Sequence, residues 1–261
     1  MPNQDWKQIL SNAQPDDHIV QLYQDVDFYC DAISHFATEG LIRGESIILV
    51  ATAPNWVNIA AQLEGKGFAI SELFDRGQLT LLDANETLPK FMRNGVPDGT
   101  IFKPLASKTI EQARGEGKYP RVRWWGEMVN VLYVEGNGRA SNQLEQFFDQ
   151  VAHEQNIAIF CSFLMDQYDP AIYEEAFSNV CATHSKVIPA RDYQVHRDAV
   201  NVAIEQIIGP IEGKLLQSLV SWKGAVAMPT SQSMLLWIKD TIPDRFCDVL
   251  EKAKSYERGA H

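Results

Sequence analysis

The sequence predicts an α/β fold in three layers, with a mostly parallel central sheet between helices and an added C-terminal helical segment. Short apolar runs alternate with amphipathic helical patterns up to residue 190, and such alternation is typical of right-handed βαβ units. From residue 191 onward the pattern is helical throughout. The chain therefore divides into an N-terminal extension (1–15), an α/β domain (16–190) and a C-terminal helical region (191–261).

Five apolar runs predict the strands of the sheet. They cover residues 18–23, 45–52, 78–84, 122–128 and 157–164. The run over 45–52 contains an unbroken apolar stretch, as expected for a strand that is buried on both faces. Between the strands, apolar residues at helical spacing predict helices that include 98–114 and 139–154.

The C-terminal region carries an unusually long apolar stripe. Apolar residues recur between Val200 and Leu219, a break falls at 227–231, and Pro243 begins the last predicted helix. Such a stripe needs a partner surface. That surface is either the chain's own domain, or a homodimer or partner regulatory protein that receives a signal through these helices.

Charge and composition limit the possible partners. The chain of 261 residues has a net charge of -11, and a field of that sign repels phosphate backbones, so no direct nucleic-acid partner is expected. The sequence contains no run of about 18 apolar residues, so no membrane span is predicted. The N-terminal residues lack the pattern of a secretory signal, and the four cysteines form no CxxC pair. These features predict a cytoplasmic protein with reduced thiols.

Polar and aromatic side chains stand at the carboxyl ends of the predicted strands, where open parallel sheets bind their ligands. Tyr23, Asp25, Asp83, Trp125 and Glu127 occupy these positions, and we expect them to line a ligand pocket. Both aspartates have an alternative role, because aspartate is also a preferred N-cap of a following helix.

Glu127 is the strongest single candidate, because it ends the apolar and aromatic strand that contains the motif WWGEM. A carboxylate in that setting must be paired, lie in a cleft or have a raised pKa, and such groups are frequent in functional sites. Trp124 and Trp125 point to opposite sides of the strand. One of them therefore packs in the core, while the other lines the pocket or lies under a helix.

Several longer segments follow one another in an order that identifies a family resemblance. They are DDHIVQLYQDVDF (16–28), FATEGLIRGESIILVAT (36–52), LFDRGQLTLLDANETLPKFM (73–92), RWWGEMVNVLYVEGN (123–137), LEQFFDQVAHEQNIAIFCSF (144–163) and NVCATHSKVIPA (179–190). This ordered set resembles the MEDS family, a sensory domain named after methanogens, methylotrophs and a dichloromethane-responsive repressor. The resemblance implies a regulatory protein that senses a small organic ligand.

The MEDS family is in turn similar to KaiC and RecA-type ATPases, in which the first strand leads into a GxxxxGKS/T loop that holds the phosphates. Here the same place reads YQDVDFYCDA, without glycine, lysine, serine or threonine. The resemblance therefore implies a KaiC/RecA-like fold with a degenerate P-loop, without a nucleotide cofactor and without enzymatic activity. No helix-turn-helix pattern before His18 and no kinase module after Pro189 is recognised, so we expect the signal to pass through the C-terminal helices or through a partner protein.

His18 begins the first predicted strand, and its place in the family motif makes it a candidate ligand-binding residue. The alternative is a hydrogen-bonded structural histidine. Cys181 and His184 form a CxxH pair on a predicted helix, but a stable zinc site usually needs four ligands. Cys161, His18 and His153 would have to converge on that pair. Spacing alone does not bring them together, so the sequence predicts neither a metal nor another cofactor.

Two alternatives to the sensor remain open from the sequence. The same crevice could serve a nucleotide-binding protein or an enzyme with Glu127 as general base. The chain could also be a docking scaffold that resembles an inactive ATPase and has no enclosed pocket.

Overall fold

The computed structural model describes residues 5–174, 176–222 and 228–259. Its centre is a six-stranded sheet with the strand order β3-β2-β6-β7-β1-β8, in which all paired neighbours run parallel. The strands are β1 (His18–Tyr23), β2 (Ser46–Ala51), β3 (Leu79–Asp83), β6 (Val122–Gly126), β7 (Ala158–Leu164) and β8 (Lys186–Ile188). The predicted α/β class with a parallel sheet is therefore confirmed.

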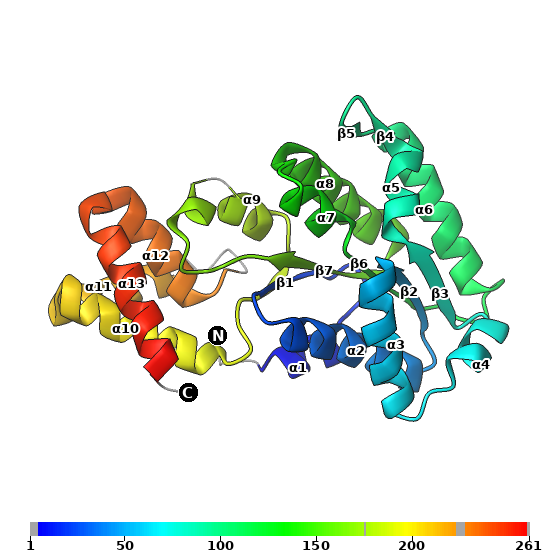
Figure 1. Ribbon diagram of the computed structural model, residues 1–261, viewed down its shortest axis with the longest axis horizontal. Helices are drawn as coiled ribbons and strands as arrows, with labels where there is room; N and C mark the ends of the chain where they lie inside the picture. The colour runs from blue at the N-terminus through cyan, green and yellow to red at the C-terminus, as the bar shows by residue number, and fades with distance from the viewer. Residues whose placement is uncertain (1–4, 175, 223–227, 260–261) are drawn as a thin grey trace.

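Helices cover both faces of the sheet (Figure 1). One face packs against α1 (Trp6–Ser11), α2 (Val26–Ile42), α3 (Ala53–Gly65) and α4 (Ile70–Asp75). The other packs against α5 (Ala84–Phe91), α6 (Gly99–Arg114), α7 (Met128–Val134), α8 (Gly138–Gln155) and α9 (Ala176–Ala182). The small hairpin of β4 (Met92–Arg93) and β5 (Val96–Pro97) lies between α5 and α6, and the short 3-10 helix η1 (Pro170–Tyr173) precedes α9.

All five predicted strands form, but the sixth strand, β8, was not predicted. It has three residues and begins with a lysine, so it lacks the length and apolar character of the other strands. Its pairing with β1 makes β1 an interior strand of the sheet. The N-terminal extension also contains a helix, α1, whose Trp6 and Leu10 are buried.

The C-terminal region consists of α10 (Tyr193–Ile207), α11 (Pro210–Trp222), α12 (Thr230–Thr241) and α13 (Pro243–Gly259). The predicted apolar stripe is divided between α10 and α11, because Gly209 adopts a φ of +135° directly before Pro210. Pro243 begins the last helix, as predicted. The predicted break at 227–231 lies partly outside the described residues.

The C-terminal helices lie beside the carboxyl ends of β1 and β7 (Figure 1), and polar contacts attach them to the α/β domain. Lys254 of α13 pairs with Asp166 at 2.8 Å, and the Tyr168 hydroxyl donates to Glu257 of α13. Gln232 of α12 donates to the side chain of Gln167 at 2.6 Å. No helix within the described residues is long and apolar enough to cross a membrane.

Candidate metal centre

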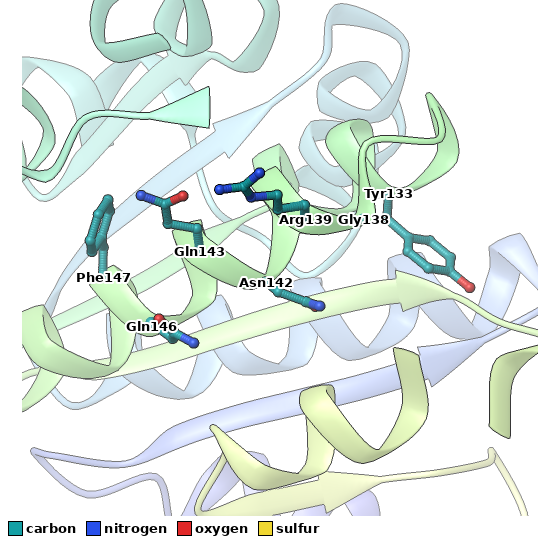
Figure 2. Close-up of a pocket in the computed structure, with 7 residues that line it drawn as sticks. All are labelled: Tyr133, Gly138, Arg139, Asn142, Gln143, Gln146 and Phe147. Carbon is teal, nitrogen blue, oxygen red and sulfur yellow. The ribbon is translucent and has the colours of Figure 1, made fainter. Parts of the chain in front are cut away.

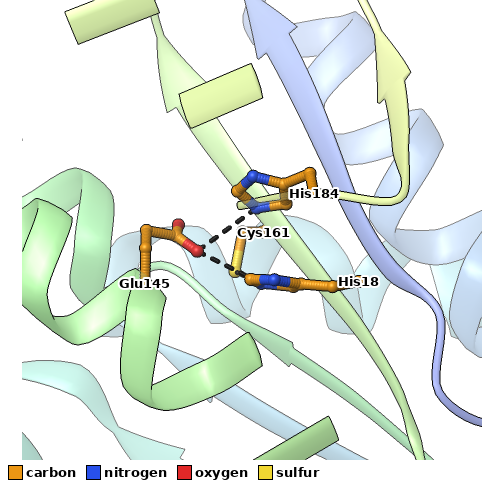
Figure 3. Close-up of side chains that lie close together, drawn as sticks. All are labelled: His18, Glu145, Cys161 and His184. Carbon is orange, nitrogen blue, oxygen red and sulfur yellow. Dashed lines mark hydrogen bonds and ion pairs between the residues drawn. The ribbon is translucent and has the colours of Figure 1, made fainter. Parts of the chain in front are cut away.

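Four potential metal donors converge on the sheet face beneath α8: His18, Glu145, Cys161 and His184 (Figure 3). His18 is the first residue of β1, and Cys161 lies on the neighbouring strand β7. Glu145 points down from α8, on the same helix face as the buried Leu144 and Phe148. His184 lies in the turn between α9 and β8. Segments far apart in the sequence thus meet at one point.

The donor atoms are spaced like the corners of a small coordination polyhedron. Glu145 Oε2 lies 3.1 Å from Nε2 of His18 and 3.2 Å from Nε2 of His184, and Cys161 Sγ lies 3.6 Å from Nε2 of His18. Zinc–ligand bonds of about 2.0 Å to nitrogen or oxygen and about 2.3 Å to sulfur give tetrahedral edges of roughly 3.3 and 3.6 Å. The remaining donor separations are all within 4.8 Å.

Both imidazole rings are held by backbone carbonyls. Nδ1 of His18 contacts the Thr183 carbonyl at 2.8 Å, and Nδ1 of His184 contacts the Val180 carbonyl. Because a carbonyl only accepts, each Nδ1 carries the proton, and each Nε2 faces the centre. A backbone or carboxylate partner on the second ring nitrogen is the usual support of a metal-bound histidine.

The Glu145 carboxylate is buried and is held by ion-pair contacts with the two histidine rings. Both of its oxygens and Nε2 of His184 lack a hydrogen-bond partner among the described residues, although the carboxylate approaches the two rings at ion-pair distance. Burying a carboxylate is costly unless it is paired or coordinates a metal. The convergence of two imidazole nitrogens, one sulfur and one carboxylate oxygen on one point therefore fits a divalent cation such as Zn²⁺.

Without a cation, a proton on His18 balances the negative charge of the Glu145 carboxylate. Burial lowers the pKa of His18, but Asp149 and Glu145 outweigh this effect and raise that pKa to about 9. Burial and the His18 charge lower the pKa of His184. Burial raises the pKa of Glu145, but His184 and His18 outweigh it and lower that pKa to about 2. A metal ion would thus replace the His18 proton beside an ionised Glu145.

The Cys161 thiol is protonated in the metal-free centre, since burial and Glu145 raise its pKa well above the usual value. Metal binding would release this proton, because the thiolate is the form that ligates.

Of the six residues predicted to bind ligand, only His18 belongs to this centre. Asp25 and Asp83 are helix N-caps: Asp25 accepts from the backbone of Asp27 and Phe28, and Asp83 accepts from that of Glu86. Asp25 also pairs with Arg191 at 3.2 Å. In the fold, both aspartates therefore have the alternative role given by the sequence analysis, that of a helix N-cap.

Glu127, Tyr23 and Trp125 lie together in a separate buried network at the carboxyl ends of the strands. The Glu127 carboxylate accepts from the Tyr29 hydroxyl at 2.8 Å, from Asn55 and from the backbone of Thr52. Tyr23 stacks on Tyr29, with ring centroids 4.4 Å apart. Trp125 is fully buried and donates to Ser162 at 3.2 Å. These side chains fill the edge of the sheet themselves.

The prediction about the CxxH pair was wrong in its geometry. Helix α9 ends at Ala182, so His184 lies beyond it and does not share a helix face with Cys181. His153 is exposed and pairs with Asp16 at 2.9 Å. Cys161 and His18 do converge with His184. The fourth donor, Glu145, was missed, because one acidic residue on an amphipathic helix carries no signal of its own.

Two cavities adjoin α8, and the smaller one lies between α8 and the end of α9. The larger, of about 550 Å³, is lined by Tyr133, Gly138, Arg139, Asn142, Gln143, Gln146 and Phe147 (Figure 2). The smaller, of about 210 Å³, is lined by Asn142, Glu145, Gln146, Asn179, Ala182 and Thr183. None of the six predicted ligand-binding residues lines either cavity, whereas the metal donor Glu145 lines the smaller one.

Residues 17–185 match the MEthanogen/methylotroph, DcmR Sensory domain family, abbreviated MEDS. The chain belongs to the MEDS family. The matched segment contains all four donors of the candidate centre, and the family assignment indicates a role in sensing or signal transduction. No curated protein gives a significant match to the MEDS chain.

One solved structure, of PCH-2 from C. elegans, aligns with 90% of the MEDS chain and 69% of its own chain, at 13% sequence identity and a TM-score of 0.22. This similarity is too weak to indicate a common function.

Proposed function

We propose that this MEDS-family chain is a non-enzymatic sensory protein whose sensing centre is a metal ion, Zn²⁺ or a close analogue, held by His18, Glu145, Cys161 and His184. The convergence of four buried donors from β1, α8, β7 and the α9–β8 turn carries the proposal. Two imidazoles, one thiolate and one carboxylate form a set that zinc accepts in tetrahedral geometry.

The position of His184 offers a route for the signal. The turn that holds it leads directly into β8, and β8 leads through Arg191 to the first C-terminal helix, α10. Arg191 pairs with Asp31 at 2.9 Å, and Gln167 donates to the Pro189 carbonyl. A change at the centre that moves His184 would therefore shift β8 and alter the packing of α10. Such coupling requires two packings of α10 that bind the ligand with different affinities.

The output surface in this proposal is α11, which acts through a homodimer or a partner regulatory protein. Ile211, Leu215 and Leu219 are each more than half exposed, and their spacing places them on one helical stripe. Exposed apolar residues that cluster in this way are typical of a protein interaction surface.

Two observations support a sensor over an enzyme. Glu127, the candidate general base, is almost fully buried and accepts hydrogen bonds from three donors, so most of its roughly four acceptor sites are already used. Four protein donors also complete a tetrahedral shell, as in structural zinc sites, whereas catalytic sites keep a position open for water.

Metal content tests the proposal. The protein is purified with zinc, dialysed and measured by mass spectrometry for bound metal, alongside His184→Gln and Glu145→Gln. We expect about one zinc per wild-type chain, and zinc affinity at least 100-fold lower in both variants, since even the loss of a supporting residue costs 10- to 100-fold. His153→Gln is the matched control and keeps full affinity. Equal zinc in wild type and His184→Gln would refute the centre.

A further inference from the structure

The C-terminal helices contact a short segment of the α/β domain, residues 166–174, which we call the docking segment. It begins two residues after the end of β7, the strand that carries the metal donor Cys161. Its partners on α12 and α13 are Lys254 for Asp166, Gln232 for Gln167, Glu257 for Tyr168 and Lys239 for the Tyr173 carbonyl. The continuation of a donor-bearing strand thus holds the helical region.

Gln167 of the docking segment also holds the chain that follows β8. Its side-chain N–H donates to the carbonyl of Pro189, the first residue after β8. The strands β7 and β8 are not neighbours in the sheet, because β1 lies between them. The Gln167 side chain therefore links the continuations of the two strands that flank β1.

The candidate metal centre connects the same three strands. Cys161 lies on β7, His18 on β1, and His184 in the turn that leads into β8. The unit β7-β1-β8 is therefore joined twice, by the metal centre and, beyond its carboxyl end, by Gln167. A change in the spacing of these strands would reach Gln167, because hydrogen-bonded strands transmit displacements as rigid elements.

The Gln167 carboxamide is planar, so the direction of its N–H groups fixes the direction of its oxygen. While the N–H donates to Pro189, the oxygen accepts from Gln232 of α12 at 2.6 Å. The Gln232 amide in turn contacts Nε2 of His196 on α10 at 2.9 Å. Gln167, Gln232 and His196 are all buried, so a lost partner leaves a buried polar group unpaired, which is costly. Loss of the Pro189 contact would therefore weaken the docking of both helices.

We propose that Gln167 couples the metal centre to the C-terminal helices, so that metal binding strengthens the docking of α10 and α12 and metal loss loosens it. The inference rests on the proposed metal centre. The helix α11 packs against both α10 and α12. The metal therefore controls how the helical region, including the exposed stripe of α11, is held on the α/β domain.

Hydrogen–deuterium exchange of the full chain, with zinc and with a chelator, measures docking through the backbone amides of α10 and α12. Allosteric coupling typically corresponds to factors of about 5 to 150, so we expect zinc to slow exchange in these helices by about fivefold or more. Gln167→Met keeps a flexible side chain of similar length but lacks the carboxamide. We expect this variant to bind zinc with the stoichiometry of wild type, while the effect of zinc on exchange falls below about twofold.

Tyr168→Phe is the matched control, because it removes a contact of the same docking segment with α13 but leaves the Gln167–Pro189 contact in place. Exchange in this variant should be faster both with and without zinc, with the ratio between the two unchanged. Gln232→Met interrupts the relay from the side of α12, so it should lose the effect of zinc even if Gln167→Met fails to fold.

Three outcomes would overturn the coupling role of Gln167 while leaving the metal centre standing. They are an unchanged effect of zinc in Gln167→Met or Gln232→Met, loss of that effect in Tyr168→Phe, and a wild type that binds zinc without any change in exchange in α10 and α12. Failure of wild type to bind zinc would instead refute the metal centre.

Discussion

Removal of zinc should lower the thermal stability of the wild-type protein by an amount that can be calculated. A ligand that binds only the folded state at about 100 times its dissociation constant adds roughly 2.7 kcal/mol to the free energy of unfolding. The four donors come from distant parts of the chain and do not form a preformed site once it unfolds. Zinc therefore acts on the folded state almost alone.

The expected shift in Tm follows from the unfolding entropy. At about 2.1 cal/mol/K per residue, a cooperative unit of 261 residues has an entropy of roughly 0.55 kcal/mol/K, so 2.7 kcal/mol corresponds to about 5 °C. If only the α/β domain of residues 16–190 unfolds with the metal, the smaller entropy gives a shift of about 7 °C. A scan with zinc and with a chelator measures the difference directly.

Two buried cysteines provide matched variants for this measurement. Cys161 and Cys181 are both almost fully buried in the same core cluster, but only Cys161 is a donor in the centre. Cys161→Ser should lose most of the zinc-dependent shift, whereas Cys181→Ser should keep it at a similar packing cost. The reasoning is refuted if zinc raises the Tm of both variants equally, or if zinc and chelator give the same Tm for wild type.

Three further predictions concern other parts of the molecule. Glu127→Gln should lower the free energy of unfolding by about 1–3 kcal/mol, because the buried donors around Glu127 lose a charged acceptor. It should leave zinc affinity unchanged. Denaturant titration measures the first effect and zinc competition the second, and a changed zinc affinity would contradict the separation of the Glu127 network from the metal centre. Burial raises the pKa of Asp166, but Lys254 and the backbone N–H of Tyr168 outweigh burial and lower that pKa. The ionised Asp166 therefore contributes fully to the free energy of unfolding above its pKa in the unfolded chain, and this contribution is lost as the pH falls through its pKa in the folded protein. Asp166→Asn should therefore lower the free energy of unfolding by about 0.5–1 kcal/mol at neutral pH, given the partial exposure of Asp166, and should leave it unchanged at a pH below both the folded and the unfolded pKa. A loss of stability that denaturant titrations find to be independent of pH would contradict this assignment. Leu215→Asp should change stability by less than about 0.5 kcal/mol but disrupt self-association or partner binding in sedimentation experiments, and an unaltered assembly would exclude α11 as the interface.

The sheet was predictable because each of its long strands carries its own signal. The run over 45–52 is apolar enough to require burial on both faces, and β2 indeed lies between β3 and β6. β8 carries no such signal, because its place is determined by hydrogen bonds to β1 and not by its own composition. Helix α7 was not predicted either, and the predicted strand over 122–128 ends earlier, at Gly126.

The candidate centre was only partly predictable, since its donors are brought together by tertiary structure. The positions of His18 and Cys161 follow from the pairing of β1 with β7, which neither segment specifies alone. Glu145 resembles any acidic residue of an exposed helix until the orientation of α8 is known. His184 becomes a donor because α9 ends before it and Val180 fixes its ring.

The location of the centre explains why the rule for ligands at the carboxyl ends of parallel strands misled the sequence interpretation. At that edge Glu127, Tyr29 and Asn55 satisfy one another, and Asp25 caps α2 where a phosphate-binding loop would have to leave space. The edge is thus filled with side chains that stabilise the fold. The buried polar atoms without a hydrogen bond among the described residues include both carboxylate oxygens of Glu145 and Nε2 of His184. These groups lie at the start of β1 and are in contact with each other only at ion-pair distance. Because buried unsatisfied groups are costly, their persistence in an otherwise well-packed core favours a bound cation there over any ligand at the opposite edge.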